Sequence, residues 1–184
     1  MPILDRETTV YPENLLADLA ERDTTRKWWA VYTKARQEKA FVRQLEGMDV
    51  PFYLPLIPKD NLIRGRRVRS HIPLFTGYVF LFGTDEERVK GLTTNRVSTV
   101  IDVKDPQQLV TDLRNIATLI ESDARLTIES RLEPGDPVRI KTGSMAGLEG
   151  TVVHRRGKTR LLVAVNMLQQ GVSIEIEDFQ VEPI

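Results

Sequence analysis

The stretch Pro73-Leu74-Phe75-Thr76-Gly77-Tyr78-Val79-Phe80 decides the fold of the N-terminal part of this chain. It belongs to a dense run of aromatic and aliphatic strand formers that continues to Phe82. Residues 78, 80 and 82 share one face of the predicted strand, and residues 79 and 81 share the other. Both faces are apolar, so two interpretations stay open: core on both sides, or core on one side and an interface on the other.

Further strands and helices are predicted around this stretch. Segments rich in strand formers predict strands at residues 28–33, 50–56 and 97–103, and a polar, Gly-interrupted segment predicts a hairpin at residues 58–70 with its tip near Arg64-Gly65-Arg66. Apolar spacing predicts helices at residues 11–22, 36–48, 85–91 and from 106 to about 121, with Asp85 and Asp105 as caps. This pattern indicates an α+β domain with an antiparallel sheet flanked by helices.

The C-terminal part has a different pattern. Val138 and Ile140 alternate with charged residues, glycines punctuate the next turns, and short strands follow at residues 152–153, 161–165, 172–176 and 179–181. Several short strands in about 50 residues predict an all-β, SH3-like small barrel. Val172, Ile174 and Ile176 should point inward, and Ser173, Glu175 and Glu177 toward water. The predicted organisation is therefore an N-terminal extension (1–26), an α+β domain (27–122), a linker (123–133) and a barrel domain (134–184).

Composition excludes several classes of protein. The 184 residues are 41% hydrophobic and include no cysteine, so disulfides and thiol chemistry are excluded. No apolar run approaches the roughly 20 residues that cross a bilayer, and residues 1–25 lack the layout of a signal peptide. We therefore expect a monomeric, cytoplasmic protein without a membrane partner.

Positive charge is concentrated in one segment of a chain whose formal net charge is zero. Residues 27–82 contain ten basic and four acidic residues. A basic stripe is formed by Arg36, Lys39 and Arg43 on the predicted helix and by Lys34 just before it, with the amides Gln37 and Gln44 closest to it. A second cluster contains Arg64, Arg66, Arg67 and Arg69. A single stripe is usually only a solvated face. Two clusters in one segment favour binding to nucleic acid.

The sequence does not predict an enzyme. His71 and His154 are the only histidines, and no clustered spacing supports a metal site or a cofactor. Gly157-Lys158-Thr159 is similar to the end of a phosphate-binding loop, but Val152 stands where that loop needs its first glycine. The segment also lies in a predicted hairpin rather than at the start of a helix.

Two sets of residues together resemble a known family. Trp28-Trp29-Ala30-Val31-Tyr32 and Pro73 to Phe80 resemble the N-terminal (NGN) domain of NusG-type transcription factors. Gly135-Asp136-Pro137-Val138-Arg139-Ile140 and the glycines after it resemble that family's KOW barrel. The likeness covers residues 27–184 in the family's domain order. Residues 62–67 and 74–75 are most similar to the specialised RfaH and UpxY types.

The resemblance implies a transcription elongation and antitermination factor. By position, Tyr32, Tyr78 and Phe80 match the surface that binds the clamp helices of RNA polymerase. Lys34 and Gln37 match positions that contact the non-template DNA strand, and Arg96 is a further candidate. The barrel would recruit Rho or a ribosomal protein, and Met167-Leu168 lies in the loop that meets such partners.

Three alternatives differ in scope. The chain acts at selected operons, as the specialised types do, or it is a general elongation factor of the same family. A third alternative is a KOW-type module that binds RNA or the ribosome and has no polymerase role. Some RfaH-type C-terminal domains refold as a helical hairpin. Valine, isoleucine and glycine are prominent in this tail, so we predict a barrel that does not switch.

Overall fold

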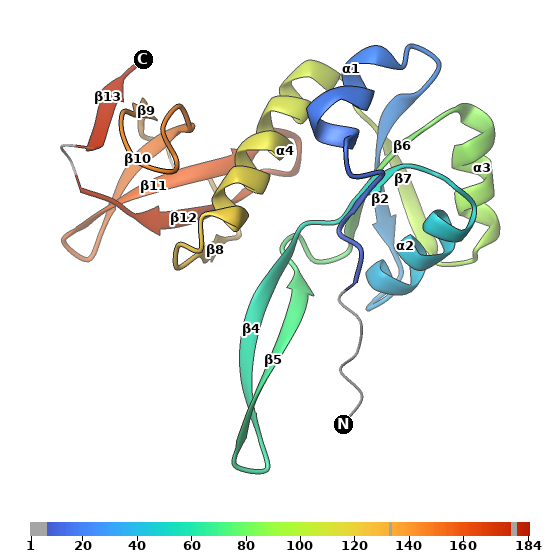
Figure 1. The fold of residues 1–184 in the computed structure, drawn as a ribbon, viewed down its shortest axis with the longest axis horizontal. Helices are drawn as coiled ribbons and strands as arrows, with labels where there is room; N and C mark the ends of the chain where they lie inside the picture. Colours follow the sequence, from blue (N-terminus) through green and yellow to red (C-terminus); the bar gives the residue numbers. More distant parts are fainter. Residues whose placement is uncertain (1–6, 133, 178–179) are drawn as a thin grey trace. The chain divides into compact units, whose positions relative to one another are not determined.

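The structure is a computed structural model that describes residues 7–132, 134–177 and 180–184 (Figure 1). Its contacts divide the chain into two compact units, residues 1–106 and 107–184, which we call the first and second units. The division falls at the start of helix α4 (Pro106–Glu121), before the predicted linker at residues 123–133. Helix α4 therefore clusters with the second unit rather than with the predicted domain at 27–122.

The first unit is built on a five-stranded antiparallel sheet. The strand order is β1-β3-β6-β2-β7, with β1 at Val10–Tyr11, β3 at Phe52–Tyr53, β6 at Tyr78–Gly83, β2 at Lys27–Thr33 and β7 at Val97–Asp102. The sequence pattern predicted a strand that begins at Leu74, but β6 begins at Tyr78. Gly77 has a φ of +87°, a left-handed conformation that ends the extended run.

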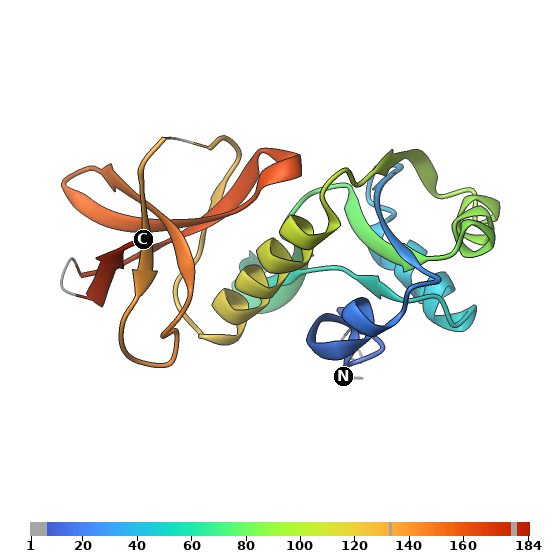
Figure 2. The ribbon, with the colours of Figure 1, turned by 90° about the horizontal axis from the view of Figure 1, so that it is seen from above.

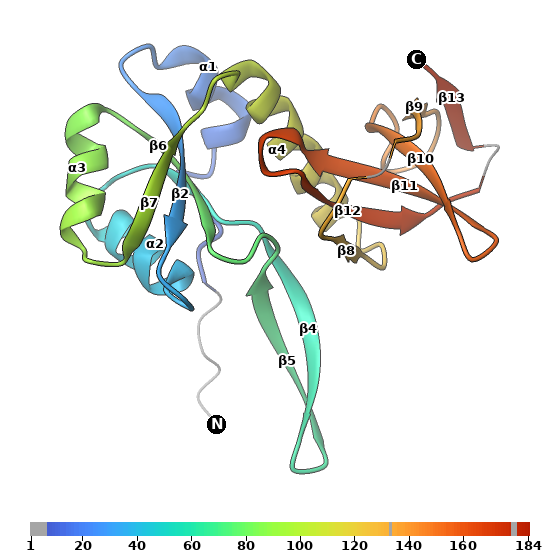
Figure 3. The same ribbon diagram turned by 180° about the vertical axis from the view of Figure 1, so that it is seen from behind.

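Two helices cover one face of this sheet (Figure 3). Helix α2 (Glu38–Gly47) buries Phe41, Val42 and Leu45 in a core that also contains residues of β2 and β6. Helix α3 (Asp85–Thr93) approaches the same face, because Gly91 lies against Leu81 and Phe41. The cap of α3 is Thr84, not the predicted Asp85. Thr84 forms a capping box with Glu87, whose carboxylate accepts from the Thr84 backbone N–H.

The opposite face of the sheet is also apolar and buried. Trp28 and Phe82 pack against each other with ring centroids 5.0 Å apart, and Ala30 and Phe80 beside them are buried. Both faces of β6 therefore consist of core residues for most of its length. Of the two interpretations of the alternating pattern, core on both sides holds for residues 79–82, whereas Tyr78 at the start of the strand is only half-buried.

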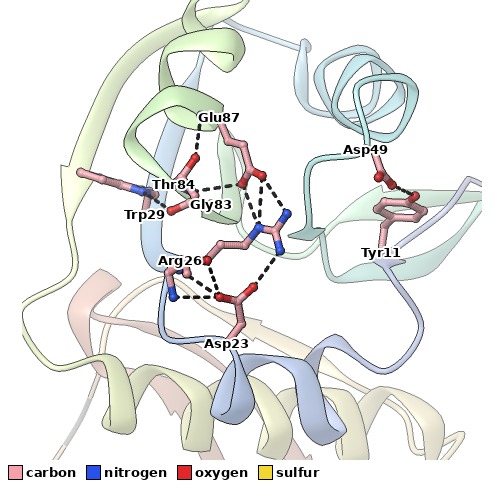
Figure 4. A network of polar contacts seen from close by, with 9 residues as sticks. Tyr11, Asp23, Arg26, Trp29, Asp49, Gly83, Thr84 and Glu87 are labelled. Atoms are coloured by element: carbon pink, nitrogen blue, oxygen red, sulfur yellow. Dashed lines mark hydrogen bonds and ion pairs between the residues drawn. The ribbon is translucent and has the colours of Figure 1, made fainter.

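The N-terminal extension is part of the first unit. The sequence predicted one helix at residues 11–22. In the structure, Tyr11 belongs to strand β1, a π-helix spans Leu15–Leu19, and the short helix α1 spans Ala20–Arg22. Strand β1 adds an edge to the sheet, and Leu15 is fully buried. Arg26 then joins this segment to α3, because its guanidinium bonds both Asp23 and Glu87 (Figure 4). Residues 1–6 of the extension lie outside the described part.

The predicted hairpin is present as a separate two-stranded sheet. Strands β4 (Leu56–Ile63) and β5 (Arg66–Pro73) pair over their full length, and the hairpin projects from the first unit as an arm (Figure 1). Arg64 and Gly65 form its tip, with φ angles of 49° and 75°. Positive φ at both central residues is typical of the tight hairpin turn whose twist matches the strands.

The second unit contains α4 and a curved six-stranded antiparallel sheet (Figure 2). The strand order is β13-β9-β10-β11-β12-β8, with β13 at Val181–Pro183, β9 at Asp136–Ile140, β10 at Glu149–Arg155, β11 at Lys158–Val165, β12 at Gln170–Glu175 and β8 at Thr127–Glu129. Strand β8 lies inside the predicted linker and pairs with β12. The predicted last strand began at Phe179, which is outside the described residues.

Strand β12 follows the predicted alternation only in part. Val172, Ile174 and Ile176 are buried as expected, and Glu175 is exposed. Ser173 was predicted to face water but is fully buried. Its hydroxyl donates to Glu129 of β8, 2.5 Å away, and accepts from Arg160, 2.9 Å away. The added strand β8 therefore covers a position that the pattern assigned to solvent.

Candidate polymerase and nucleic-acid interface

Tyr32 and Tyr78 form an aromatic pair at the end of the first unit's sheet. They are direct partners across β2 and β6, and their ring centroids lie 5.0 Å apart at 51°. Tyr32 is 43% exposed, and Tyr78 is half-buried. A Cβ atom on Gly77 would lie 2.6 Å from Cε2 of Tyr32. A glycine at this position therefore lets the Tyr32 ring lie over the turn.

A buried carboxylate fixes the turn below this pair. The backbone N–H of Gly77 donates to Oε1 of Glu38, 2.7 Å away, and the Gly77 carbonyl accepts from the backbone N–H and hydroxyl of Thr33. Glu38 and Thr33 are both buried. Sequence reasoning gave Glu38 no role. The available signal was an acidic residue inside an otherwise basic stripe.

Phe80 does not belong to the exposed part of the predicted polymerase surface. Its side chain is 0% exposed, and its ring meets Phe75 edge to face with centroids 6.3 Å apart. Phe80 lies two residues after Tyr78 on the same strand face, where the sheet is covered. Of the predicted trio, Tyr32 is exposed, Tyr78 is half-buried, and Phe80 is a core residue.

Five polar residues gather beside the aromatic pair, and we call them the polar cluster: Lys34, Gln37, Gln44, Asn95 and Arg96. Nζ of Lys34 donates to the backbone oxygen and to Oδ1 of Asn95, each 2.8 Å away. Arg96 donates to the side-chain oxygens of Gln44, at 2.7 Å, and Gln37. The structure thus brings together Lys34, Gln37 and Arg96, which the sequence proposed separately. Asn95 was missed, because its role depends on a turn in which its φ is +60°.

The remaining residues of the basic stripe differ from one another. Arg36 is exposed in a left-handed conformation, and Lys39 is half-buried. Arg43 forms an ion pair with Glu7, and the hydrogen bonds from its guanidinium to that carboxylate raise the pKa of Arg43. The charge of Arg43 is therefore compensated, whereas Arg96 is held by neutral amides. The stripe is not a uniform cationic surface.

The hairpin arm carries a second basic surface. Arg64, Arg66 and Arg67 are all exposed, and none of the three forms an ion pair with another described residue. Arg69 instead bonds Asp60 across the arm at 3.0 Å, which lowers the pKa of that carboxyl. Leu62 and Ile63 are also exposed near the tip. The arm therefore presents cations interleaved with apolar side chains.

The predicted partner loop of the second unit is a short 3₁₀ helix, η2 (Asn166–Leu168). Met167 is 37% exposed and Leu168 is half-buried. The backbone N–H of Asn166 donates to Oδ2 of Asp112 in α4, 3.0 Å away, and Asp112 is buried. Helix α4 thus anchors the loop that presents Met167.

The described residues offer no constellation for catalysis by a metal. They contain no group of three or more His, Cys, Asp or Glu residues placed to hold an ion. His71 and His154 belong to different sheets, in β5 and β10. Within the same described part, no helix is both long and apolar enough to span a membrane. The Gly157-Lys158-Thr159 stretch spans a hairpin turn and the start of β11.

Comparison with known proteins gives a consistent match. The family model described as "NusG: Transcription termination factor nusG" matches residues 26–122. The chain is also similar to "Transcription termination/antitermination protein NusG" of Staphylococcus aureus strains Mu50 and N315. Each relative is 27% identical over 183 residues, which cover 90% of this chain and 100% of the relative. The family match spans the aromatic pair, the polar cluster and the hairpin arm.

Proposed function

This chain belongs to the NusG family of transcription termination and antitermination factors, and from that premise we propose that it binds RNA polymerase through its first unit and suppresses pausing or termination. The family resemblance predicted from residues 28–32 and 73–80 is confirmed. The observation that carries the proposal is the Tyr32–Tyr78 pair. Two aromatic rings at the end of β2 and β6, whose other residues are mostly buried, are a typical anchor for a protein partner.

The neighbouring polar cluster supports a second contact, with the non-template DNA strand. Lys34 and Arg96 supply charge, and Gln37 and Gln44 hold Arg96 in a fixed orientation. Arg36 precedes α2 and Lys39 lies in its first turn, close in sequence to Gln37 of the cluster. Arg64, Arg66 and Arg67 on the arm provide a second cationic surface. Contacts of this type bind phosphate groups without reading sequence.

The second unit supports recruitment of a partner. We interpret its curved sheet as the KOW barrel of the family, with Met167 and Leu168 as the contact for Rho or a ribosomal protein. The likeness of residues 62–67 and 74–75 to the RfaH and UpxY types favours action at selected operons over a general elongation role. The site of action that we propose is the cytoplasm.

A pull-down with purified core RNA polymerase tests the proposal. Tyr32→Ala and Tyr78→Ala should each weaken binding about tenfold or more, because each removes a central aromatic anchor. Val89→Ala is the matched control, since Val89 is an exposed apolar residue on α3, away from the pair. The tyrosine variants should also fail to shorten the dwell time of polymerase at a defined pause. Binding at the wild-type level by both tyrosine variants would show that the polymerase surface lies elsewhere.

A further inference from the structure

The turn before β6 determines where the aromatic pair lies. It spans Phe75 to Tyr78 and is closed by a hydrogen bond from the backbone N–H of Tyr78 to the carbonyl oxygen of Phe75, 3.0 Å away. Gly77, its third residue, has a φ of +87°, as a type II turn requires. Tyr78 is both the last residue of this turn and the cross-strand partner of Tyr32. A shift of the turn would therefore move one ring of the pair.

The sequence of the turn restrains it only weakly. The second position of such a turn favours proline, whose ring fixes φ near about −65° before the chain folds. Thr76 occupies this position and is exposed, and no bond from its backbone N–H to another described residue is seen. The conformation of the turn therefore depends on contacts from elsewhere in the chain.

These contacts come from the segment that leads into α2. Oε1 of Glu38 accepts from the backbone N–H of Gly77, 2.7 Å away. The carbonyl oxygen of Gly77 accepts from the backbone N–H of Thr33 at 2.7 Å and from the Thr33 hydroxyl at 3.2 Å. All three residues are buried, so water does not readily replace these bonds. Both backbone polar groups of Gly77 are thus held by residues 39 and 44 positions earlier.

The same turn supports the other ring of the pair. The pairing of β2 with β7 shifts register between Tyr32 and Thr33, so regular strand pairing does not by itself fix the end of β2. Instead, Thr33 is bonded to Gly77, and the Tyr32 ring lies close to the Gly77 Cα, where a Cβ would be 2.6 Å from Cε2. The Gly77 turn therefore contacts Tyr32 and leads directly into Tyr78.

We propose that Glu38 is a positioning residue for polymerase binding, an inference that rests on the proposed function of the aromatic pair. The Glu38 carboxylate holds the Gly77 turn, and the turn holds the two rings in the arrangement that the polymerase meets. An anchor that is already held in its bound arrangement loses little conformational freedom on binding, so a fixed pair binds more tightly than a mobile one. Glu38 is buried and acts through the turn rather than by touching the polymerase.

The pull-down with core RNA polymerase, repeated over a range of polymerase concentrations, tests the proposal. Glu38→Ala should weaken binding about tenfold, because the Gly77 N–H loses a charged acceptor and the rings lose their fixed arrangement. Glu38→Gln keeps an acceptor oxygen and should bind within about threefold of the wild type. Val42→Ala is the control, because it removes buried atoms from the same helix away from the turn. It should lower the urea midpoint but leave the affinity unchanged.

Further variants separate positioning from general destabilisation. Thr76→Pro should stiffen the turn locally and restore most of the affinity that Glu38→Ala loses. In a Tyr78→Ala background, Glu38→Ala should cause at most about a twofold further loss, because the ring that follows the turn is already absent. If Glu38→Ala does not fold, Thr33→Val takes its place. That variant removes the hydroxyl bond to the same turn and should weaken binding about threefold.

Nuclear magnetic resonance of the full chain without polymerase gives an independent readout. The Tyr32 and Tyr78 rings of the wild type should show mutual NOEs, and the Gly77 amide should exchange slowly with solvent. In Glu38→Ala, the NOEs should weaken and the Gly77 amide should exchange at least about tenfold faster, while the amides of β6 stay protected.

Three results would overturn the proposal: wild-type polymerase binding by Glu38→Ala, an equal loss of binding in Val42→Ala, or NOEs and Gly77 exchange that Glu38→Ala leaves unchanged. Wild-type binding by both tyrosine variants would instead refute the proposed function of the aromatic pair. In that case, the resonance data would still decide whether Glu38 holds the two rings.

Discussion

Arg43 and Arg96 carry the same charge near the same helix, but their neighbours give them different availability. Arg43 is paired with the carboxylate of Glu7, whereas Arg96 is held by the amide oxygens of Gln37 and Gln44. An amide orients a guanidinium without neutralising it, so Arg96 keeps its full attraction for phosphate. Spacing alone placed Arg43 in the stripe and could not show its partner 36 residues earlier.

This difference predicts unequal effects on binding to single-stranded DNA. Arg96→Gln should reduce the slope of log affinity against log salt concentration by about 0.7, because one phosphate contact is lost. Arg43→Gln should change the slope much less, because the Glu7 carboxylate already compensates that charge. Titration of a labelled DNA strand at several salt concentrations measures both slopes. Equal slopes for the two variants would mean that Arg43 contacts a DNA phosphate despite its ion pair with Glu7.

The sequence singled out Lys34, Gln37 and Arg96 through the family resemblance, and the structure places the three side chains in one polar cluster. Their contact with DNA stays a prediction. Phe80 shows the limit, because alternation assigns a side chain to a face but does not say how far that face is covered. The role of Glu38 depends on the turn at Gly77, 39 residues away, which no local pattern contains.

Among the secondary-structure elements, the junction of the N-terminal segment with α3 gives a pH-dependent prediction (Figure 4). Hydrogen bonds from Thr25 first, and then from Arg26, lower the pKa of Asp23 from 3.8 to about 2. Arg26 also lowers the pKa of Glu87, which belongs to the capping box of α3. A carboxyl with a lowered pKa stabilises the fold above its unfolded pKa and loses that effect as the pH falls through its folded pKa.

Asp23→Asn should therefore reduce the free energy of unfolding by about 1 kcal/mol at pH 6, given that water screens part of the pair. The difference from the wild type should shrink as the pH falls from about 4 to 2. Urea unfolding at a series of pH values measures it. Asp102→Asn is the control, because Asp102 is exposed and no bond from its side chain is seen among the described residues. A difference that stays constant down to pH 2 would contradict the assignment to the charge of Asp23.

The elements themselves were predicted well where one strong local signal was present. The arm, α2, α3 and the strands around Tyr78 all lie near their predicted residues. Strand β8 was missed because Thr127–Glu129 is short and polar, and it exists as a strand through pairing with β12. The burial of Ser173 was missed for the same reason, because Ser173 is covered by β8, where its hydroxyl donates to Glu129. Tertiary pairing overrides weak local propensity at such positions.

For the chain as a whole, the main question is where one folding unit ends. The family match runs to residue 122, but α4 clusters with the second unit from residue 107 onward. Asp112 provides a reason, because its buried carboxylate accepts from Gln108 and from the backbone of Asn166. The helix pattern predicted α4 itself, but it contained no information about which core its apolar residues join.

Asp112→Ala should weaken the second unit by about 2 kcal/mol, because the backbone N–H of Asn166 loses a charged acceptor. The first unit should be unaffected. Both tryptophans lie in that unit, so their fluorescence reports its urea midpoint, and amide hydrogen exchange in β11 reports the second. Glu121→Ala is the control, since it removes an exposed carboxylate from the same helix. An equal loss in both units would show that they unfold together.

The position of α4 has a practical consequence for chimaeric factors. A hybrid that joins residues 1–122 of this chain to the C-terminal part of a relative would place Asp112 beside the relative's loop. That loop need not offer a backbone N–H at the position of Asn166. A junction at residue 106 keeps the helix with Asn166 and transfers the pair intact. Exchanges of partner specificity between relatives should therefore succeed more often when the crossover precedes α4.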